Sequence, residues 1–299
     1  MIIGNQNNLR FLENALKNSN LGHALCFVGP DQIGKRTIAK YLSSIVLKTE
    51  PDKLASHADF HYIKREVDEK KDRLKKDISI AQAKSVNSFL ANRSWFGGKK
   101  VVIIDEAETM NIEAANALLK SLEESVENSL FFLLTVNDDF LPITIKSRCQ
   151  IVNFSLLPHN ELISGLISRG YDSEKIDEVI KFAWGRPGRA IEMLEDEEKF
   201  NNEINEISRI RSLINAPFYK KLKEIEDIFG DKNDAVRGRD RISSIINTWT
   251  MVWRDYLRDE KNINRHFAFE VIEEFSRAQQ LIKQNIHPRL LIEKIILKI

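Results

Sequence analysis

One glycine-rich segment of the sequence has the composition of a phosphate-binding loop. Gly29, Gly34 and Lys35 fit the spacing G-x4-G-K directly after an apolar run. In such loops the backbone N–H groups wrap a polyphosphate, the N-terminus of the following helix attracts it, and the lysine reaches its outer phosphates. Arg36 stands where Ser or Thr normally binds Mg²⁺, and Thr37 lies about 100° further around the helix. The spacing predicts a loop that binds phosphates but holds the metal poorly, and a glycine turn without nucleotide is the alternative.

Two acidic residues, Asp105 and Glu106, follow the apolar run 101–104. In phosphoryl-transfer sites an aspartate at this place positions Mg²⁺, and a glutamate polarises the attacking water. Taken alone, two acids after an apolar run are better explained as a plain strand end or helix start. Because the glycine loop precedes them, we expect them to be the second element of the same site.

Polar residues also end the next apolar run, 130–136. Thr135 and Asn137 are expected at the carboxyl edge of the same sheet, where open α/β folds place their ligands. A side chain there could orient the hydrolytic water or contact the terminal phosphate, and ordinary turn chemistry is the equal alternative. Further along, Arg148 stands in the triplet Ser-Arg-Cys and would by itself be a plain surface charge.

The elements that must position these residues alternate between strands and helices. Apolar runs predict strands, those over 101–104 and 130–136 being buried on both faces, and helical spacing predicts helices. We expect strands over 23–28, 59–64, 101–104 and 130–136, and helices over 35–47, 79–93 and 114–122. This alternation predicts a parallel α/β sheet. Residues 65–77, rich in Lys and Asp without an apolar period, are expected to form a solvated loop or a ragged helix end.

Helical patterns occupy the chain from about residue 156 onward. They are interrupted at Gly170, at the segment 185–188, at Pro217 and at Pro288. The fold class is therefore expected to be α/β plus all-α. Wide apolar faces in the last hundred residues predict a helical bundle core, with some excess on the last helix for contacts with another protein.

Composition limits the remaining possibilities. A chain of 299 residues predicts about two to three domains. The net charge of +1 disfavours independent high-affinity DNA binding through phosphate contacts. No apolar run approaches the roughly 18 residues of a membrane span, and the first residues lack the order of a secretory signal, so we expect a cytoplasmic protein without membrane contact. Cys26 and Cys149 are too few for a structural zinc site, and no metal is expected.

Four segments together carry a family resemblance over about residues 1–200. They are HALCFVGPDQIGKRTIAKYL, GGKKVVIIDEAETMNIEAANALLKSLEE, FFLLTVNDDFLPITIKSRCQ and GRPGRAIEML. They resemble the clamp-loader subunits of bacterial DNA polymerase III, most closely the delta-prime subunits, which belong to the AAA+ superfamily of ATPases. The SRC triplet preceded by LP-x-T-I is the most specific part of the resemblance.

The resemblance implies a role for each candidate residue. Gly29, Gly34, Lys35 and Thr37 would form the phosphate site, Asp105 and Glu106 would be the Walker B acids, Thr135 or Asn137 would be sensor 1, and Arg189 would lie near the sensor 2 position. Arg148 would be an arginine finger that acts in the nucleotide site of a neighbouring subunit. Such a finger stabilises transition-state charge and is worth on the order of 10³–10⁵ in rate.

Two departures from the family pattern affect this interpretation. Members often carry a four-cysteine zinc module before the Walker B strand, whereas residues 43–100 contain no cysteine, so no zinc is expected. Arg36 separates the chain from the motor subunits, which keep Thr or Ser after the lysine. ATP is therefore an open ligand of this loop, with Mg²⁺ only if ATP binds, and Glu106 is expected to be vestigial or weak.

The sequence thus predicts a three-part chain: an AAA+ module over 1–155, a helical lid over 156–200 and a helical oligomerisation domain over 201–299. We expect a delta-prime-like subunit that helps to load a sliding clamp onto primed DNA. Its expected partners are gamma/tau-like and delta-like subunits, with the clamp met indirectly and primed DNA through the assembly. A catalytically active AAA+ ATPase, with Thr37 rescuing Mg²⁺ binding, and a pure scaffold with an empty loop are the alternatives.

Overall fold

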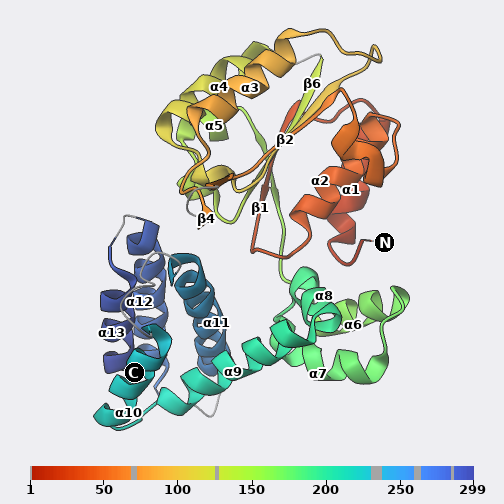
Figure 1. Cartoon of the computed structure of the whole chain (residues 1–299). Coiled ribbons are helices and arrows are strands. Elements are labelled where there is room, and N and C mark those ends of the chain that lie inside the picture. The colour runs from red at the N-terminus through yellow and green to blue at the C-terminus, as the bar shows by residue number, and fades with distance from the viewer. Residues whose placement is uncertain (1, 69–72, 125–127, 230–237, 259–263, 284–285) are drawn as a thin grey trace. The chain divides into compact units, whose positions relative to one another are not determined.

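The computed structural model describes residues 2–299 except 69–72, 125–127, 230–237, 259–263 and 284–285 (Figure 1). The chain forms two compact units, Met1–Leu194 and Glu195–Ile299. The first contains the predicted α/β module together with the helices that we predict to be a lid. None of the described helices is both long and apolar enough to cross a membrane.

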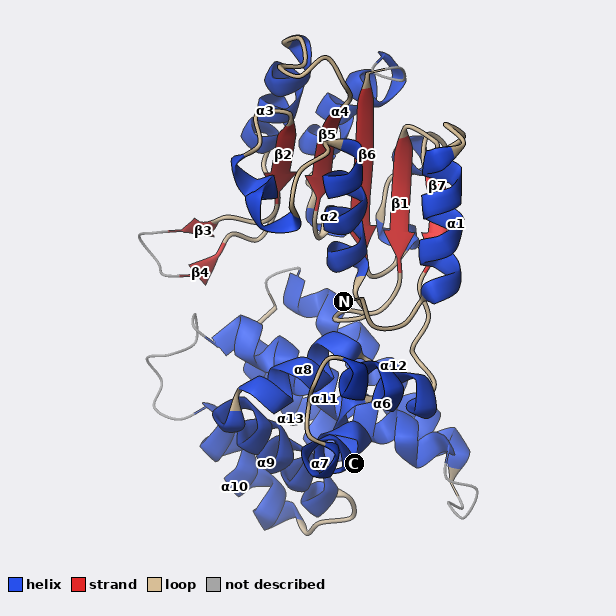
Figure 2. Cartoon of the chain, turned by 90° about the vertical axis from the view of Figure 1, so that its right-hand side faces the viewer, coloured by secondary structure: helices blue, strands red, loops and turns tan. Residues whose placement is uncertain are grey.

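A parallel five-stranded sheet forms the centre of the first unit (Figure 2). Its strands are β1 (Ala24–Val28), β2 (Phe60–Ile63), β5 (Lys100–Ile104), β6 (Ser129–Thr135) and β7 (Gln150–Asn153). They lie in the order β2-β5-β6-β1-β7, and every neighbouring pair is parallel. The predicted parallel sheet is confirmed.

Helices cover both faces of this sheet, which explains why its central strands are apolar throughout. All residues of β1, β5 and β6 are buried. One face packs on α1 (Gln6–Lys17) and α2 (Lys35–Val46), and the other on α3 (Ile80–Ala91), α4 (Ile112–Glu124) and α5 (Ile143–Lys146). Alternate residues of each strand therefore enter two separate cores.

The sequence did not reveal β7. This edge strand has only one buried residue, Val152, among polar or exposed neighbours, so it lacks the continuous apolar run of the central strands. Its place in the sheet is determined by pairing with β1, in which Leu25 aligns with Gln150 and Val28 with Asn153.

Residues 65–77 differ from the expected loop or ragged helix end. They contain an antiparallel hairpin of β3 (Val67–Asp68) and β4 (Arg73–Leu74), which follows the carboxyl end of β2 (Figure 2). Lys75 extends the pairing, since its N–H donates to the Glu66 carbonyl at 2.7 Å and its Nζ contacts the Glu66 carboxylate at 2.6 Å. Charged side chains thus stabilise a short strand pair that no apolar periodicity in the sequence predicts.

From residue 156 onward the described elements are all helices, as predicted, while the predicted helix ends at residues 237 and 285 lie outside the described residues. They are α6 (His159–Ser168), α7 (Ser173–Ala183), α8 (Pro187–Glu195), α9 (Glu197–Leu213), α10 (Phe218–Phe229), α11 (Gly238–Arg258), α12 (Arg265–Lys283) and α13 (Pro288–Lys298). Short 3-10 helices lie at η1 (Pro51–Ser56), η2 (Ala107–Thr109) and η3 (Asp138–Phe140). In the second unit Trp249, Trp253 and Phe275 are fully buried and form the expected core, whereas Phe269 and Leu290 of the predicted apolar faces are exposed.

Candidate functional site

The glycine loop joins β1 to α2, as a phosphate-binding loop requires. Gln32 and Gly34 have φ angles of 62° and 104°, so the backbone turns in the left-handed region, and the space beside Gly34 is open. Lys35 is buried, and its Nζ donates hydrogen bonds to the Gly29 carbonyl and, at 2.9 Å, to the Pro30 carbonyl. Burial lowers the pKa of Lys35 from its ordinary value.

The start of α8 closes one side of this loop. The Gly188 N–H donates to the Gln32 carbonyl at 2.8 Å, and a Cβ on Gly188 would lie only 2.9 Å from that oxygen. Arg189 turns elsewhere, since its Nε donates to the Phe182 carbonyl at 3.0 Å and its guanidinium lies 4.9 Å from the centre of the Trp184 ring. The structure therefore places Gly188 of α8 against the loop. The side chain of the next residue, Arg189, which is the predicted sensor 2 residue, contacts α7 instead.

Asp105 lies at the carboxyl end of β5 and is enclosed by donors. Its Oδ2 accepts hydrogen bonds from Arg36 Nε at 2.5 Å and from the Tyr62 hydroxyl at 2.6 Å. Its Oδ1 accepts from the Glu106 N–H at 3.1 Å. Burial and the bond to Asp105 both raise the pKa of Tyr62 above its ordinary value. Burial alone would lower the pKa of Arg36, but the charge of Asp105 outweighs it and raises that pKa.

Glu106 is engaged in the same way by a second arginine. Arg65 donates to the two Glu106 carboxylate oxygens, from Nε at 2.6 Å and from Nη2 at 3.1 Å, which is the bidentate geometry of a strong ion pair. The φ angle of Glu106 is 54°, a conformation that costs a non-glycine residue on the order of 1 kcal/mol or more. The geometry keeps the carboxylate on Arg65.

These contacts bear on whether the site fits Mg²⁺. A magnesium site of this type needs a hydroxyl at position 36 and free oxygens on the aspartate. Here Arg36 takes the first place and also binds Asp105, while Thr37 is exposed on α2. Within the described ranges no group of three or more His, Cys, Asp or Glu side chains could hold a metal ion. The residues present do not fit Mg²⁺.

The two candidate sensor 1 residues use their side chains locally. The buried Thr135 hydroxyl donates to the Asn137 carbonyl at 2.9 Å. The Asn137 side-chain oxygen accepts from the Asp139 N–H at 3.0 Å and caps η3. Both interactions match the turn-chemistry alternative, with the pair lying directly after the carboxyl end of β6.

Arg148 follows the short helix α5 on the surface of the first unit. Its Nε donates to the Glu123 carboxylate at 2.7 Å, and its Nη2 contacts the same carboxylate. Its Nη1 donates to the Thr144 carbonyl at 2.9 Å and to the Ser147 hydroxyl at 3.1 Å. One third of the Arg148 side chain remains exposed. Burial raises the pKa of the neighbouring Cys149 to about 11, so its thiol is no nucleophile.

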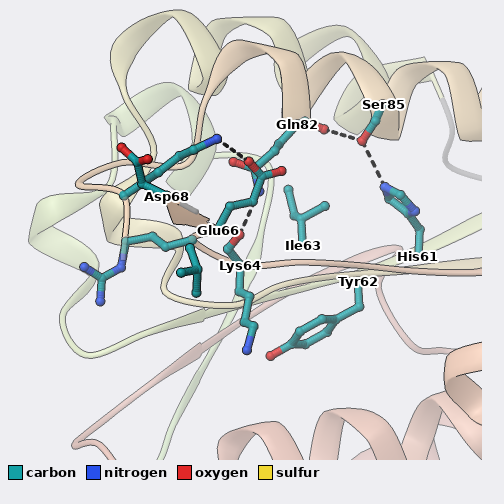
Figure 3. Close-up of a pocket in the computed structure, with 11 residues that line it drawn as sticks. His61, Tyr62, Ile63, Lys64, Glu66, Asp68, Gln82 and Ser85 are labelled. Carbon is teal, nitrogen blue, oxygen red and sulfur yellow. Dashed lines mark hydrogen bonds and ion pairs between the residues drawn. The ribbon is translucent and has the colours of Figure 1, made fainter. Parts of the chain in front are cut away.

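The structure also contains a hollow of 820 Å³ between β2, the hairpin and α3 (Figure 3). Several of its polar groups already have partners. Gln82 Nε2 donates to the Lys64 carbonyl at 2.7 Å, and the His61 ring nitrogen Nε2 lies 3.1 Å from the Ser85 hydroxyl. Burial lowers the pKa of His61, so the ring is held neutral. The hollow shares no lining residue with the glycine loop, and none of the predicted site residues lines it.

A sequence profile of the family described as "DNA polymerase III, delta subunit" matches residues 4–158. The chain belongs to this family. The resemblance stated from the sequence is thereby confirmed at the level of the family.

Several proteins are similar to this delta-family chain. DNA polymerase III subunit delta' of Pseudomonas aeruginosa is 33% identical over 141 residues, which cover 42% of this chain and 41% of that protein. The corresponding subunit of Haemophilus influenzae is 37% identical over 123 residues, 40% of this chain and 37% of that protein. The chain thus spans about two fifths of the length of these two relatives.

A solved structure supports the fold. The DNA polymerase III gamma subunit-related protein of Thermotoga maritima aligns with a TM-score of 0.55 at 18% identity and covers 96% of this chain and 97% of that one. This likeness and the five-stranded parallel sheet confirm the predicted fold class, an α/β module with a parallel sheet accompanied by helical parts.

Three residues that shape the site of this delta-family chain, and the role of a fourth, were not predicted from the sequence. Arg36 was seen as a missing hydroxyl, not as a partner of Asp105, and Tyr62, Arg65 and Glu123 were not singled out. Tyr62 lies in β2 and Arg65 follows that strand, so the strand order could have placed them near Asp105 and Glu106. The sequence alone does not contain that order, because β2 pairs with β5 across the intervening helix α3.

Proposed function

We propose that this chain is a delta-prime-like subunit of a DNA polymerase III clamp loader and that it donates Arg148 to the nucleotide site of a neighbouring subunit. Its partners would be gamma/tau-like and delta-like subunits in the cytoplasm, and it would meet the clamp and primed DNA through the assembly. The three-part division at about residues 155 and 200 belongs to the same proposal, with the last part forming the contacts that hold the assembly together.

The single observation that carries the proposal is the placement of Arg148. It follows a four-residue helix at the surface and is oriented by its own segment through the Thr144 carbonyl and the Ser147 hydroxyl. A guanidinium held by neutral oxygens keeps its full charge for an incoming phosphate. Its ion pair with Glu123 is partly exposed and is therefore weak enough to exchange for a phosphate.

The contacts of Asp105 and Glu106 favour a subunit that assists a neighbouring ATPase over one that hydrolyses ATP itself. Asp105 and Glu106 are each held by an arginine of the same chain. A glutamate in a bidentate ion pair is poorly placed to activate the attacking water, because Arg65 occupies both of its carboxylate oxygens. ATP at the chain's own loop would then serve binding and not turnover.

The test uses a loader reconstituted from its separately purified subunits. We expect Arg148→Ala to lower the DNA- and clamp-stimulated ATPase rate by on the order of 10³-fold at the site it reaches. Arg169→Ala is the matched control, because this exposed arginine on the same unit has no side-chain partner among the described residues. A loader with Arg148→Ala that keeps full stimulated activity would refute the finger. Turnover by the isolated chain, abolished by Glu106→Gln, would favour an active ATPase instead.

A further inference from the structure

Arg36 has hydrogen-bond donors that its ion pair with Asp105 does not use. Only its Nε bonds to the carboxylate, and in the part of the chain that the structure describes Nη1 and Nη2 have no hydrogen-bond partner. More than half of the side chain is exposed. The planar fork of a guanidinium can bind a carboxylate with one edge and a phosphate oxygen with another. Arg36 therefore has the chemistry to join the aspartate to a phosphate, as a metal ion does elsewhere.

The hydrogen bonds and the burial of the Asp105 carboxylate suit a guanidinium better than Mg²⁺. Both of its oxygens already accept hydrogen bonds, from Arg36 and Tyr62 on Oδ2 and from the Glu106 N–H on Oδ1. The side chain is only 9% exposed. Removing the guanidinium from a nearly buried carboxylate would leave that charge unpaired, which is costly. Mg²⁺ dehydrates reluctantly and demands near-octahedral geometry, so it competes poorly for such a group.

We propose that Arg36 takes the place of Mg²⁺ in this chain and that the glycine loop binds ATP as the metal-free polyphosphate. Lys35, Arg36 and the N-terminus of α2 supply the positive charge, and the open space beside Gly34 receives the phosphates. A nucleoside triphosphate without Mg²⁺ carries more negative charge than its magnesium complex, which suits a site that provides its own cation. Glu106 stays on Arg65, so the bound nucleotide is held and not hydrolysed.

Calorimetric titration of the whole chain with ATP tests this directly. One titration contains EDTA and the other excess MgCl₂. We expect binding in EDTA, with Mg²⁺ either leaving Kd unchanged or raising it. No heat in EDTA would overturn the proposal. A Kd lower by more than about threefold in MgCl₂ than in EDTA would overturn it too, because ATP would then bind better with the metal than without it.

The variant Arg36→Thr restores a hydroxyl at the metal position and removes the guanidinium from Asp105, which keeps its hydrogen bonds from Tyr62 and the Glu106 N–H. We expect it to acquire metal dependence, with Mg²⁺ tightening ATP binding by about tenfold or more. Arg10→Thr, the same substitution at an exposed arginine of α1, is the control for loss of charge and should bind as the wild type does. Circular dichroism confirms that both variants fold. An Arg36→Thr chain that binds ATP equally with and without Mg²⁺ would overturn the assignment to Arg36.

The result is separable from the proposed finger. The titration uses the isolated chain, and Arg148 acts only in an assembly. Failure of metal-free binding would leave the Arg148 test unaffected, and failure of the finger would leave the titration unaffected.

Discussion

Glu123 holds the arginine that we propose as a finger, and its removal should make that finger more available. Glu123→Gln abolishes the carboxylate charge while keeping the size of the side chain. Arg148 would keep its hydrogen bonds to the Thr144 carbonyl and the Ser147 hydroxyl, so the finger remains oriented. Docking in a neighbouring subunit would no longer require an ion pair to be broken first.

The size of the effect follows from the exposure of the pair. The Arg148 and Glu123 side chains are 33% and 50% exposed, which places the pair among surface ion pairs worth about 0.2–1 kcal/mol. If docking of Arg148 no longer has to break this ion pair, the full value of about 0.2–1 kcal/mol corresponds to an increase of the ATPase rate of about 1.4- to 5-fold. The assay is the stimulated ATPase rate of the reconstituted loader. Glu124→Gln is the control, since the only ion pair of Glu124 among the described residues is a 3.8 Å contact with Lys120. A rate at or below that of the wild type would refute the reasoning, because the contact with Glu123 would then be the active arrangement.

Two further predictions concern the stability of the first unit. Buried Asp59 accepts hydrogen bonds from the Trp95 and following backbone N–H groups, so Asp59→Asn should lower the free energy of unfolding in urea by about 1–3 kcal/mol. Burial would raise the pKa of Asp59, but these bonds outweigh it and lower that pKa, so the carboxylate stabilises the fold above its unfolded-state pKa and loses this effect as the pH falls through the lower native value. The difference between wild type and Asp59→Asn should therefore shrink in strong acid, and a constant difference would contradict this. Gly29→Ala should cost about 1–3 kcal/mol, because its Cβ would lie 2.4 Å from the Phe154 carbonyl, whereas Gly98→Ala, with open space around it, should be nearly neutral; equal effects in thermal unfolding would disprove the steric argument.

Much of the fold was accessible from the sequence because its signals are local. The continuous apolar runs that became β5 and β6 are buried on both faces, and the helical spacing after residue 156 became helices with the expected breaks. Strand β7 and the antiparallel pair of β3 and β4 were missed for one reason. Both are stabilised by pairing with a neighbouring strand and not by an apolar pattern of their own.

The sequence predicted which strand ends carry the candidate site residues, but not the contacts that these residues make. The glycine loop, Asp105 and Glu106 were placed at the correct strand ends because parallel strands bring their carboxyl ends to one edge. The partners of these residues come from elsewhere, since Tyr62 and Arg65 belong to β2 and its exit. Arg189 shows the opposite case: its position in the sequence lies near the expected one, but its side chain is directed to the Phe182 carbonyl.

What the sequence by itself determined is the family, the alternation of strands and helices, and the absence of a hydroxyl after Lys35. These properties are local or carried by motif order. Only the tertiary structure decided what replaces that hydroxyl: Arg36 reaches the Asp105 carboxylate 69 positions away, and Arg65 reaches Glu106 41 positions away. The physical reason is the sheet itself, because the order β2-β5-β6-β1 brings these strand ends to one edge, where the charge of a buried carboxylate selects the nearest available cation.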